Sequence, residues 1–205
     1  VEFGPMTVYH LPLDCSFDLR SVMMRWPNLA LEAHSTDYQK PAAYPRLAEL
    51  GFAYQKVGPA LTFAWRQAIY ALDQMLSFLH GSAPIVIPTM ERIMLENAGA
   101  WQSHYQGEPN AKFAQRHLAL ADRIRYYWPH PDAQAAVSAL MTAMESQTLN
   151  RSVSELFFPN STLERAELCG GLNAETLITS SVEQSLEPYF FHSGSFAAPA
   201  RERSA

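Results

Sequence analysis

Two stretches of the chain, 29–33 and 52–57, predict β-strands, and polar residues gather at the end of each. In a parallel α/β sheet or barrel, the carboxyl ends of the strands meet at one edge, and ligands bind in the loops at that edge. Residues placed there could orient a ligand group, contact a phosphate or hold a metal ion. The sequence therefore predicts a ligand site that contains Glu32, His34, Asp37, Lys56 and Gly58.

Side chains alternate along a strand, so Glu32 and His34 are expected to share one face of the first strand. A short right-handed crossover would make the two strands parallel neighbours, and Glu32 and Lys56 could then face each other. One interpretation is a buried ion pair inside the sheet, and the other is a pair that orients a ligand group. Both can hold together. A lysine beside a carboxylate stays protonated, which disfavours a Schiff-base role for Lys56.

Gly58 and Pro59 open the clearest helix of the sequence, which is expected to run to His80. A strand that ends in glycine and turns into a helix presents free backbone N–H groups, and such a helix N-terminus suits a phosphate. Lys56, Thr62 and Arg66 could add charge or hydrogen bonds. The alternative is plain turn chemistry before a helix.

Arg123 and Arg125 lie in the last turns of a helix expected over 110–128. Two cations at a helix C-terminus suit the helix dipole, which is one interpretation. The other is that one of them reaches an anionic ligand or clamps Glu32 or Asp37.

His34 is the residue most suited to bind a metal, because it stands at a strand end beside acidic residues. One histidine with two carboxylates falls short of a clear site, since catalytic zinc usually takes three protein ligands; zinc is therefore left open as a cofactor. The sequence lacks GxxxxGK[ST], GxGxxG, HExxH and GxSxG, which argues against common nucleotide-binding proteins, zinc proteases and serine hydrolases.

Hydrophobic spacing and capping residues predict a mainly helical chain after the second strand. Residues 84–88 are expected to be an apolar linker, with Thr89 as the N-cap of the helix that follows. Asn173 is expected to cap the last helix. The predicted helices cover 17–25, 41–50, 59–80, 89–97, 100–106, 110–128, 131–145, 152–158, 162–169 and 174–191.

The 205 residues are 48% hydrophobic and 17% charged, enough for one domain or for a piece of a larger one. A net charge of -5 gives no general attraction to polyanions, so nucleic acid is not expected as a partner. Two distant cysteines predict reduced thiols in a cytoplasm. The sequence has no apolar run long enough to predict a membrane-spanning helix. It starts at Val1, with neither an initiator Met nor a signal sequence, which suggests a fragment.

Three blocks of the sequence carry a resemblance to a known family: EAHSTDYQ at 32–39, KVGPALTFAWRQAIYAL at 56–72 and DRIRYYWPH at 122–130. In order and spacing they resemble the signature blocks of the non-catalytic subunit of class II D-tagatose-1,6-bisphosphate aldolase. The opening VEFG and the segment 157–189 are also similar to that family. The resemblance covers most of the chain, which corresponds to the C-terminal half of the family.

The resemblance implies an α/β fold, namely the C-terminal part of a TIM-type (β/α)8 barrel with 29–33 and 52–57 as its last two strands. It implies barrel units over 1–81 and a helical extension packed on the barrel over 82–192. The small and polar residues over 193–205 are expected to form a disordered tail. Two strands cannot close a barrel, so the chain is not expected to fold natively alone.

The resemblance also implies a protein that supports the activity and stability of a separate catalytic aldolase subunit, which is zinc-dependent, in galactitol or N-acetylgalactosamine catabolism. The five strand-end residues would line a sugar-phosphate pocket, with Arg123 and Arg125 as further anion contacts. The competing hypothesis is a metal-dependent aldolase or other sugar-phosphate enzyme in its own right, with His34 as a ligand and Lys56 on the phosphate. An older family label, tagatose-6-phosphate kinase, has no support from a nucleotide loop. A third possibility is that the chain is the product of a truncated gene and has no function. Oligomer formation is also left open.

Overall fold

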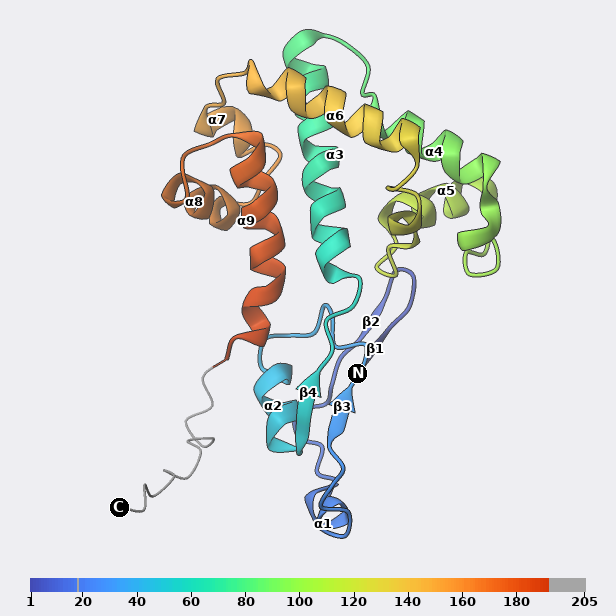
Figure 1. Ribbon diagram of the computed structural model, residues 1–205, viewed down its shortest axis with the longest axis vertical. Coiled ribbons are helices and arrows are strands. Elements are labelled where there is room, and N and C mark those ends of the chain that lie inside the picture. The colour runs from blue at the N-terminus through green and yellow to red at the C-terminus, as the bar shows by residue number, and fades with distance from the viewer. Residues whose placement is uncertain (18, 192–205) are drawn as a thin grey trace.

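The computed structural model describes residues 1–17 and 19–191, and the tail expected over 193–205 lies outside these residues. Short strands and two small helices form one end of the molecule, and the longer helices form the other (Figure 1). The strands make two pairs: β1 (Glu2–Phe3) with β2 (Val8–Tyr9) is antiparallel, and β3 (Leu31–Ala33) with β4 (Phe52–Gln55) is parallel. The described chain is thus a mixed α/β structure that is mostly helical.

The parallel pair confirms both predicted strands and their direction, although each is shorter than expected. α2 (Ala43–Glu49) forms the crossover between them, and α1 (Leu19–Met24) precedes β3. The register places Glu32 opposite Tyr54, with an irregularity between Leu31 and Glu32. Lys56 lies beyond β4, where its N–H donates to the carbonyl of Ala33 at 2.9 Å.

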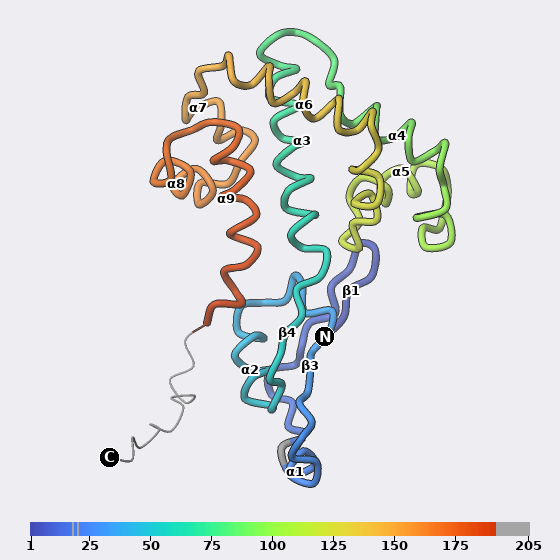
Figure 2. The backbone as a smooth tube through the Cα atoms, viewed as in Figure 1, coloured from blue at the N-terminus to red at the C-terminus, as the bar shows by residue number. Residues whose placement is uncertain are grey.

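The central element is α3 (Ala60–His80), which ends at Gly81 in the left-handed conformation with φ 63°. Glycine adopts this conformation without steric cost, which explains the stop that the sequence predicted. The helix runs along the middle of the helical region and lies beside α9 (Ala174–Leu186), while α6 (Pro131–Glu145) crosses it (Figures 1 and 2). Its buried residues recur at three- and four-residue spacing, as an amphipathic helix requires, and include Ala64, Ala68, Ile69, Leu72 and Met75.

The expected linker over 84–88 and the expected cap at Thr89 are wrong, because α4 (Val86–Glu96) begins three residues earlier. Asp73 of α3 causes the earlier start. Its carboxylate accepts hydrogen bonds from the N–H groups of Ile85 at 2.9 Å and Val86 at 2.8 Å. These are the donors that a helix start leaves without partners, so a residue of another helix caps α4.

The helix expected over 110–128 is also interrupted. α5 (Pro109–Leu118) ends early, Asp122 adopts a left-handed conformation with φ 45°, and a 3₁₀ turn, η2 (Arg123–Tyr126), follows. The turn brings the buried carboxylate of Asp122 to the buried guanidinium of Arg66, with a distance of 2.6 Å between Nε and Oδ1. A buried charge without a partner is costly, which explains why this ion pair prevails over helix continuation.

The C-terminal helices confirm the prediction of a helical tail, and Asn173 caps α9 through a capping box with Thr176. One connected hydrophobic core extends from α3 to α9. None of the described helices is both long and apolar enough to span a membrane. The remaining elements are η1 (Ala98–Ala100), α7 (Arg151–Ser154), α8 (Asn160–Leu168) and η3 (Glu187–Tyr189).

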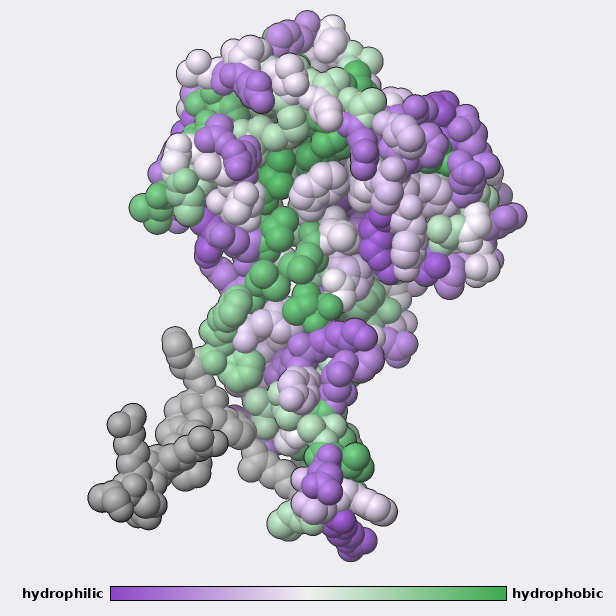
Figure 3. Space-filling model, viewed as in Figure 1, coloured by the Kyte–Doolittle hydropathy of each residue, from purple (hydrophilic) through white to green (hydrophobic). Residues whose placement is uncertain are grey.

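Hydrophobic surface continues down the middle of the molecule between two groups of helices (Figure 3). Here a groove of about 410 Å³ passes over α3, and its walls include Phe63, Leu118, Leu156 and Phe157. A second apolar region lies at the strand end of the molecule, where Trp26, Leu29 and Tyr54 are exposed.

Candidate functional site at the strand ends

The loop 35–39, which follows β3, connects several segments of the chain that are distant in the sequence. Ser35 and Tyr38 have φ angles of 55° and 62°, a left-handed backbone conformation that non-glycine residues seldom adopt. Residues held in this conformation cluster at functional sites and persist only when their surroundings fix them. In this loop, the four consecutive side chains from Thr36 to Gln39 form hydrogen bonds with other segments of the chain.

Thr36 and Asp37 join the loop to β4, α3 and the C-terminal turn. The Thr36 hydroxyl donates to the carbonyl of Lys56 at 2.9 Å and lies 2.9 Å from the Tyr189 hydroxyl. Asp37 Oδ1 accepts from the Gly58 N–H at 3.0 Å and from the Tyr189 hydroxyl at 3.1 Å. Two strand ends and the C-terminal turn are therefore held together by two side chains.

Tyr38 and Gln39 join the same loop to two further segments. The Tyr38 hydroxyl donates to the carbonyl of Leu120 at 2.7 Å, and its ring packs edge-on against Phe3 and Phe63. The Gln39 amide accepts from Leu11 N–H at 2.9 Å and donates to the β2 carbonyl of Tyr9 at 3.1 Å. The amide thereby fixes the N-terminal hairpin on the loop.

Asp37 is the buried acid of this site, only 1% exposed. Burial raises its pKa above the ordinary range, while hydrogen bonds from Gly58 and Tyr189 oppose the rise. Its second carboxylate oxygen, Oδ2, is buried without a hydrogen-bond partner among the described residues. A Cβ at Gly58 would lie 2.4 Å from this oxygen, so any larger residue there would force the buried Asp37 carboxylate to move.

The predicted phosphate position at the start of α3 has a carboxylate beside it. The Gly58 N–H, which was expected to be free for an anion, donates to Asp37. An anion at this helix N-terminus would have to share or displace that contact. The helix dipole there already stabilises a negative charge.

Glu32 and His34 lie together on one face of β3, as the alternation of side chains predicted. Glu32 Oε1 is 2.8 Å from His34 Nε2, and both side chains are about half exposed. They line a cavity of about 390 Å³ whose walls are otherwise apolar and include Val1, Leu11, Phe17, Leu47 and Phe52. An imidazole beside a carboxylate can exchange a proton with a ligand at this place.

The predicted contact between Glu32 and Lys56 is wrong. The strand register sets Glu32 opposite Tyr54, and the Glu32 carboxylate pairs with His34 instead. Lys56 is exposed, and only its backbone joins the network around the loop. Register depends on the irregularity after Leu31, which the period of two along a strand does not reveal.

Arg123 and Arg125 do not clamp Glu32 or Asp37. Arg123 donates through Nε to the carbonyl of Ala100, and Arg125 donates through Nη1 to the carbonyls of Ala121 and Asp122. Both guanidinium groups lie against the ring of Tyr126. They neighbour the strand-end loop through Leu120, which Tyr38 holds.

Arg66, expected to add charge at the phosphate position, is instead buried at 1% exposure and paired with Asp122. Its position on the buried stripe of α3, four residues before Tyr70, could have indicated this from the sequence. The role of Tyr189 gave no such signal, because its partners are about 150 residues away.

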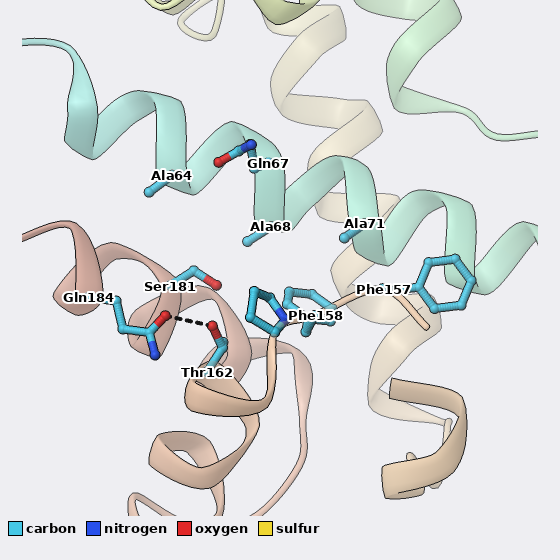
Figure 4. Close-up of a pocket in the computed structure, with 10 residues that line it drawn as sticks. Ala64, Gln67, Ala68, Ala71, Phe157, Phe158, Thr162, Ser181 and Gln184 are labelled. Carbon is cyan, nitrogen blue, oxygen red and sulfur yellow. Dashed lines mark hydrogen bonds between the residues drawn. The ribbon is translucent and has the colours of Figure 1, made fainter. Parts of the chain in front are cut away.

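A cavity of about 330 Å³ between α3 and the C-terminal helices contains none of the predicted site residues. Ala64, Ala68 and Ala71 line its α3 side, and Thr162 donates to Gln184 at 2.8 Å on the other (Figure 4). Small alanines facing bulky Phe158 leave this space between packed helices. We assign it to imperfect helix packing rather than to the strand-end site.

No group of three or more metal-ligating side chains occurs within residues 1–17 and 19–191. His34 has Glu32 as its only such neighbour in an ion pair. The described residues therefore do not fit a three-ligand catalytic zinc site by themselves.

Comparisons with known proteins agree on one family. The family model described as "D-tagatose-1,6-bisphosphate aldolase subunit GatZ/KbaZ-like" matches residues 1–193. A D-tagatose 6-phosphate 4-epimerase of Agrobacterium fabrum is 38% identical, with 95% of this chain and 45% of that protein covered. The D-tagatose-1,6-bisphosphate aldolase subunit GatZ of Salmonella paratyphi B is 34% identical, with 93% and 45% covered.

Among solved structures, a probable tagatose 6 phosphate kinase from Sinorhizobium meliloti 1021 matches with a TM-score of 0.85 and 36% identity. The match covers 92% of this chain and 49% of that one. The chain thus spans about half the length of the relatives it matches.

Proposed function

Because the chain belongs to the D-tagatose-1,6-bisphosphate aldolase subunit GatZ/KbaZ-like family, we propose that it is the C-terminal half of a non-catalytic aldolase subunit. Its role would be to support the activity and stability of the catalytic subunit of a class II tagatose-bisphosphate aldolase. The observation that carries the proposal is the family match over residues 1–193, which includes the loop 35–39 and both arginine-bearing blocks. Galactitol or N-acetylgalactosamine catabolism in the cytoplasm is the setting that we propose.

For the fold, we propose that β3 and β4 are the last two strands of a TIM-type barrel, with 1–81 as barrel units and 82–192 as a helical extension. The parallel pair joined by α2 and followed by α3 supports this arrangement, since βαβα order is the repeat of such barrels. Exposed Tyr54 in β4 and Leu29 just before β3 support it too, because strands buried on both faces carry apolar residues. The additional length of the relatives would supply the other strands.

For the site, we propose a sugar-phosphate pocket at the carboxyl ends of β3 and β4. Glu32 and His34 offer groups for sugar hydroxyls in the 390 Å³ cavity, and exposed Lys56, which follows β4, adds a positive charge near the strand ends. Asp37 acts differently: it is buried, and it holds the strand-end loop on α3.

A second candidate function is a sugar-phosphate enzyme in its own right. The 38% identity to a protein named D-tagatose 6-phosphate 4-epimerase favours this alternative. The Glu32 and His34 pair, at 2.8 Å, supplies a group that could accept or return a proton.

The two candidates differ in what the protein does alone. We would measure cleavage of tagatose 1,6-bisphosphate by the catalytic aldolase subunit, with and without the protein. The half-life of this aldolase activity at raised temperature would be measured in the same two conditions. In parallel, the protein alone would be incubated with tagatose 6-phosphate and the products separated. If the protein raises and prolongs cleavage by the catalytic subunit but catalyses no reaction by itself, the result favours the non-catalytic subunit. Epimerisation by the protein alone favours the enzyme. A His34→Gln variant should lose epimerisation but keep the support of the aldolase.

A further inference from the structure

Among the arginines from Arg46 to Arg165, two differ from the others because no carboxylate neutralises them. From Arg46 to Arg165, each of the other arginines forms an ion pair with at least one Asp or Glu side chain. Arg123 and Arg125 form none with any described residue. The neutralised arginines are Arg46 with Glu49, Arg66 with Asp122, Arg92 with Glu96 and Asp132, Arg116 with Glu91, Arg151 with Glu155 and Glu167, and Arg165 with Glu183 and Glu187.

The two unneutralised guanidinium groups converge on one exposed tyrosine. Their central carbons lie 5.4 Å and 4.3 Å from the centre of the Tyr126 ring, for Arg123 and Arg125 respectively. Nη2 of Arg125 also donates to the Tyr126 hydroxyl at 2.7 Å. That hydroxyl oxygen is the acceptor, so its own proton stays available for another group. The Tyr126 side chain is 52% exposed, which leaves the cluster open to a ligand.

Backbone carbonyls hold both arginines in place without cancelling their charge. Arg123 bonds through Nε to Ala100, which leaves its two Nη groups without a partner among the described residues. Arg125 bonds through Nη1 to Ala121 and Asp122. The donors are therefore oriented before any ligand arrives, which lowers the entropy lost on binding.

We propose that Arg123, Arg125 and Tyr126 form a receptor for a phosphate monoester. Guanidinium forks match the oxygens of a phosphate, and two forks with one hydroxyl provide several donors to a dianion. Because the net charge of the chain is -5, attraction of a phosphate to this place would come from the local pair of arginines and not from an overall positive charge.

The receptor borders the strand-end loop. The Tyr38 hydroxyl bonds to Leu120, which precedes η2, and Leu120 N–H donates to Pro5 at 2.7 Å. A phosphate bound at this receptor would therefore lie next to the strand-end loop. The choice of a sugar phosphate as the natural ligand rests on the proposed function, whereas recognition of the phosphate group does not.

The test is a calorimetric titration of the purified protein with inorganic phosphate, tagatose 6-phosphate and unphosphorylated tagatose. We expect both phosphates to bind, with affinity that falls as salt increases, and tagatose to bind at least tenfold more weakly than its phosphate. Arg123→Gln and Arg125→Gln should each weaken phosphate binding by about tenfold, and Tyr126→Phe by about threefold. Arg151→Gln removes an exposed arginine that carboxylates neutralise, and it should leave binding unchanged.

Near-UV circular dichroism would verify that each variant is folded; if a glutamine variant is not, the corresponding lysine variant is expected to bind phosphate more weakly, since it lacks the fork. Absence of phosphate binding, or equal binding by the wild type and both arginine variants, would overturn the receptor. Stimulation of the aldolase is measured separately with the same variants, so the proposed function can fail while the receptor stands, and the reverse.

Discussion

The hydroxyl of Tyr189 lies 3.1 Å from Oδ1 of Asp37, although 152 positions separate the two residues in the sequence. This contact ties the last described turn of the chain to the loop after β3, next to the start of α3. Thr36 lies within hydrogen-bond distance of the same hydroxyl. The C-terminal helices are therefore connected directly to the candidate site.

Replacing Tyr189 with phenylalanine should remove this connection with little change in packing. We expect a loss of about 1 kcal/mol in the free energy of unfolding. The pKa of Asp37 should rise further, because the hydrogen bond from Tyr189 lowers it. Urea unfolding and NMR titration of the carboxyl carbon measure the two effects. Tyr54→Phe is the control, since Tyr54 is 64% exposed and should affect neither quantity; an unchanged Asp37 pKa in the Tyr189 variant would contradict the contact.

Gly58→Ala should destabilise the protein, because the added Cβ would lie 2.4 Å from Asp37 Oδ2. Overpacking of this kind typically costs about 1–3 kcal/mol. Gly99→Ala is the matched control, since nothing lies within 4 Å of a Cβ placed there. In an Asp37→Ala background the cost of Gly58→Ala should shrink, and thermal unfolding of the four proteins gives that coupling energy. Equal costs in both backgrounds would show that Asp37 is not the obstacle.

The buried pair of Arg66 and Asp122 should be sensitive to loss of one partner. Arg66→Met leaves a buried carboxylate without its cation, with an expected cost of about 3–5 kcal/mol. Adding Asp122→Asn should recover part of this loss, because the stranded charge is removed. Arg151 forms ion pairs at the surface, and its side chain is 36% exposed. Arg151→Met should therefore lower the free energy of unfolding by at most about 1 kcal/mol. Chemical denaturation compares these three variants with the wild type, and similar costs at Arg66 and Arg151 would refute the interpretation.

Acid should weaken the packing of α3, α4 and α5, because His117 of α5 contacts both Tyr70 of α3 and Glu91 of α4. Burial lowers the pKa of His117, and the nearby Arg116 and Arg66 lower it further, against the opposing effect of Glu91. Nδ1 lies 2.7 Å from the Tyr70 hydroxyl, and Nε2 lies 3.1 Å from Glu91. Since burial raises the pKa of Tyr70, its hydroxyl stays protonated and donates to Nδ1, which a protonated imidazole could not accept.

The sign of the pH effect follows from this order of pKa values. The unfolded chain takes up the histidine proton near the ordinary value of 6.5, before the folded chain does. Stability from this group is therefore complete above pH 6.5 and is lost as the pH falls from there toward the folded-state pKa. Melting temperatures between pH 8 and 5 should fall less steeply in His117→Gln, while His104→Gln, at an exposed site, should follow the wild type. Identical slopes for all three proteins would exclude His117 as the source.

The sequence by itself determined the features that depend on neighbouring residues. Period and turn chemistry identified both parallel strands, the course of α3 to Gly81 and the cap at Asn173, because local backbone preferences fix such elements. The three signature blocks also identified the family, which the match over residues 1–193 confirms.

Tertiary structure decided whatever depends on contacts between distant segments. Asp73 of α3 caps α4, which therefore begins earlier than the residues of α4 indicated. Asp122 adopts a left-handed conformation and pairs with Arg66, and Tyr189 bonds to Asp37. In each case a buried polar group had to find a partner, and the partner lay on another element. Burial makes an unpaired charge or hydrogen-bonding group costly, so packing, which no local pattern encodes, selected these contacts.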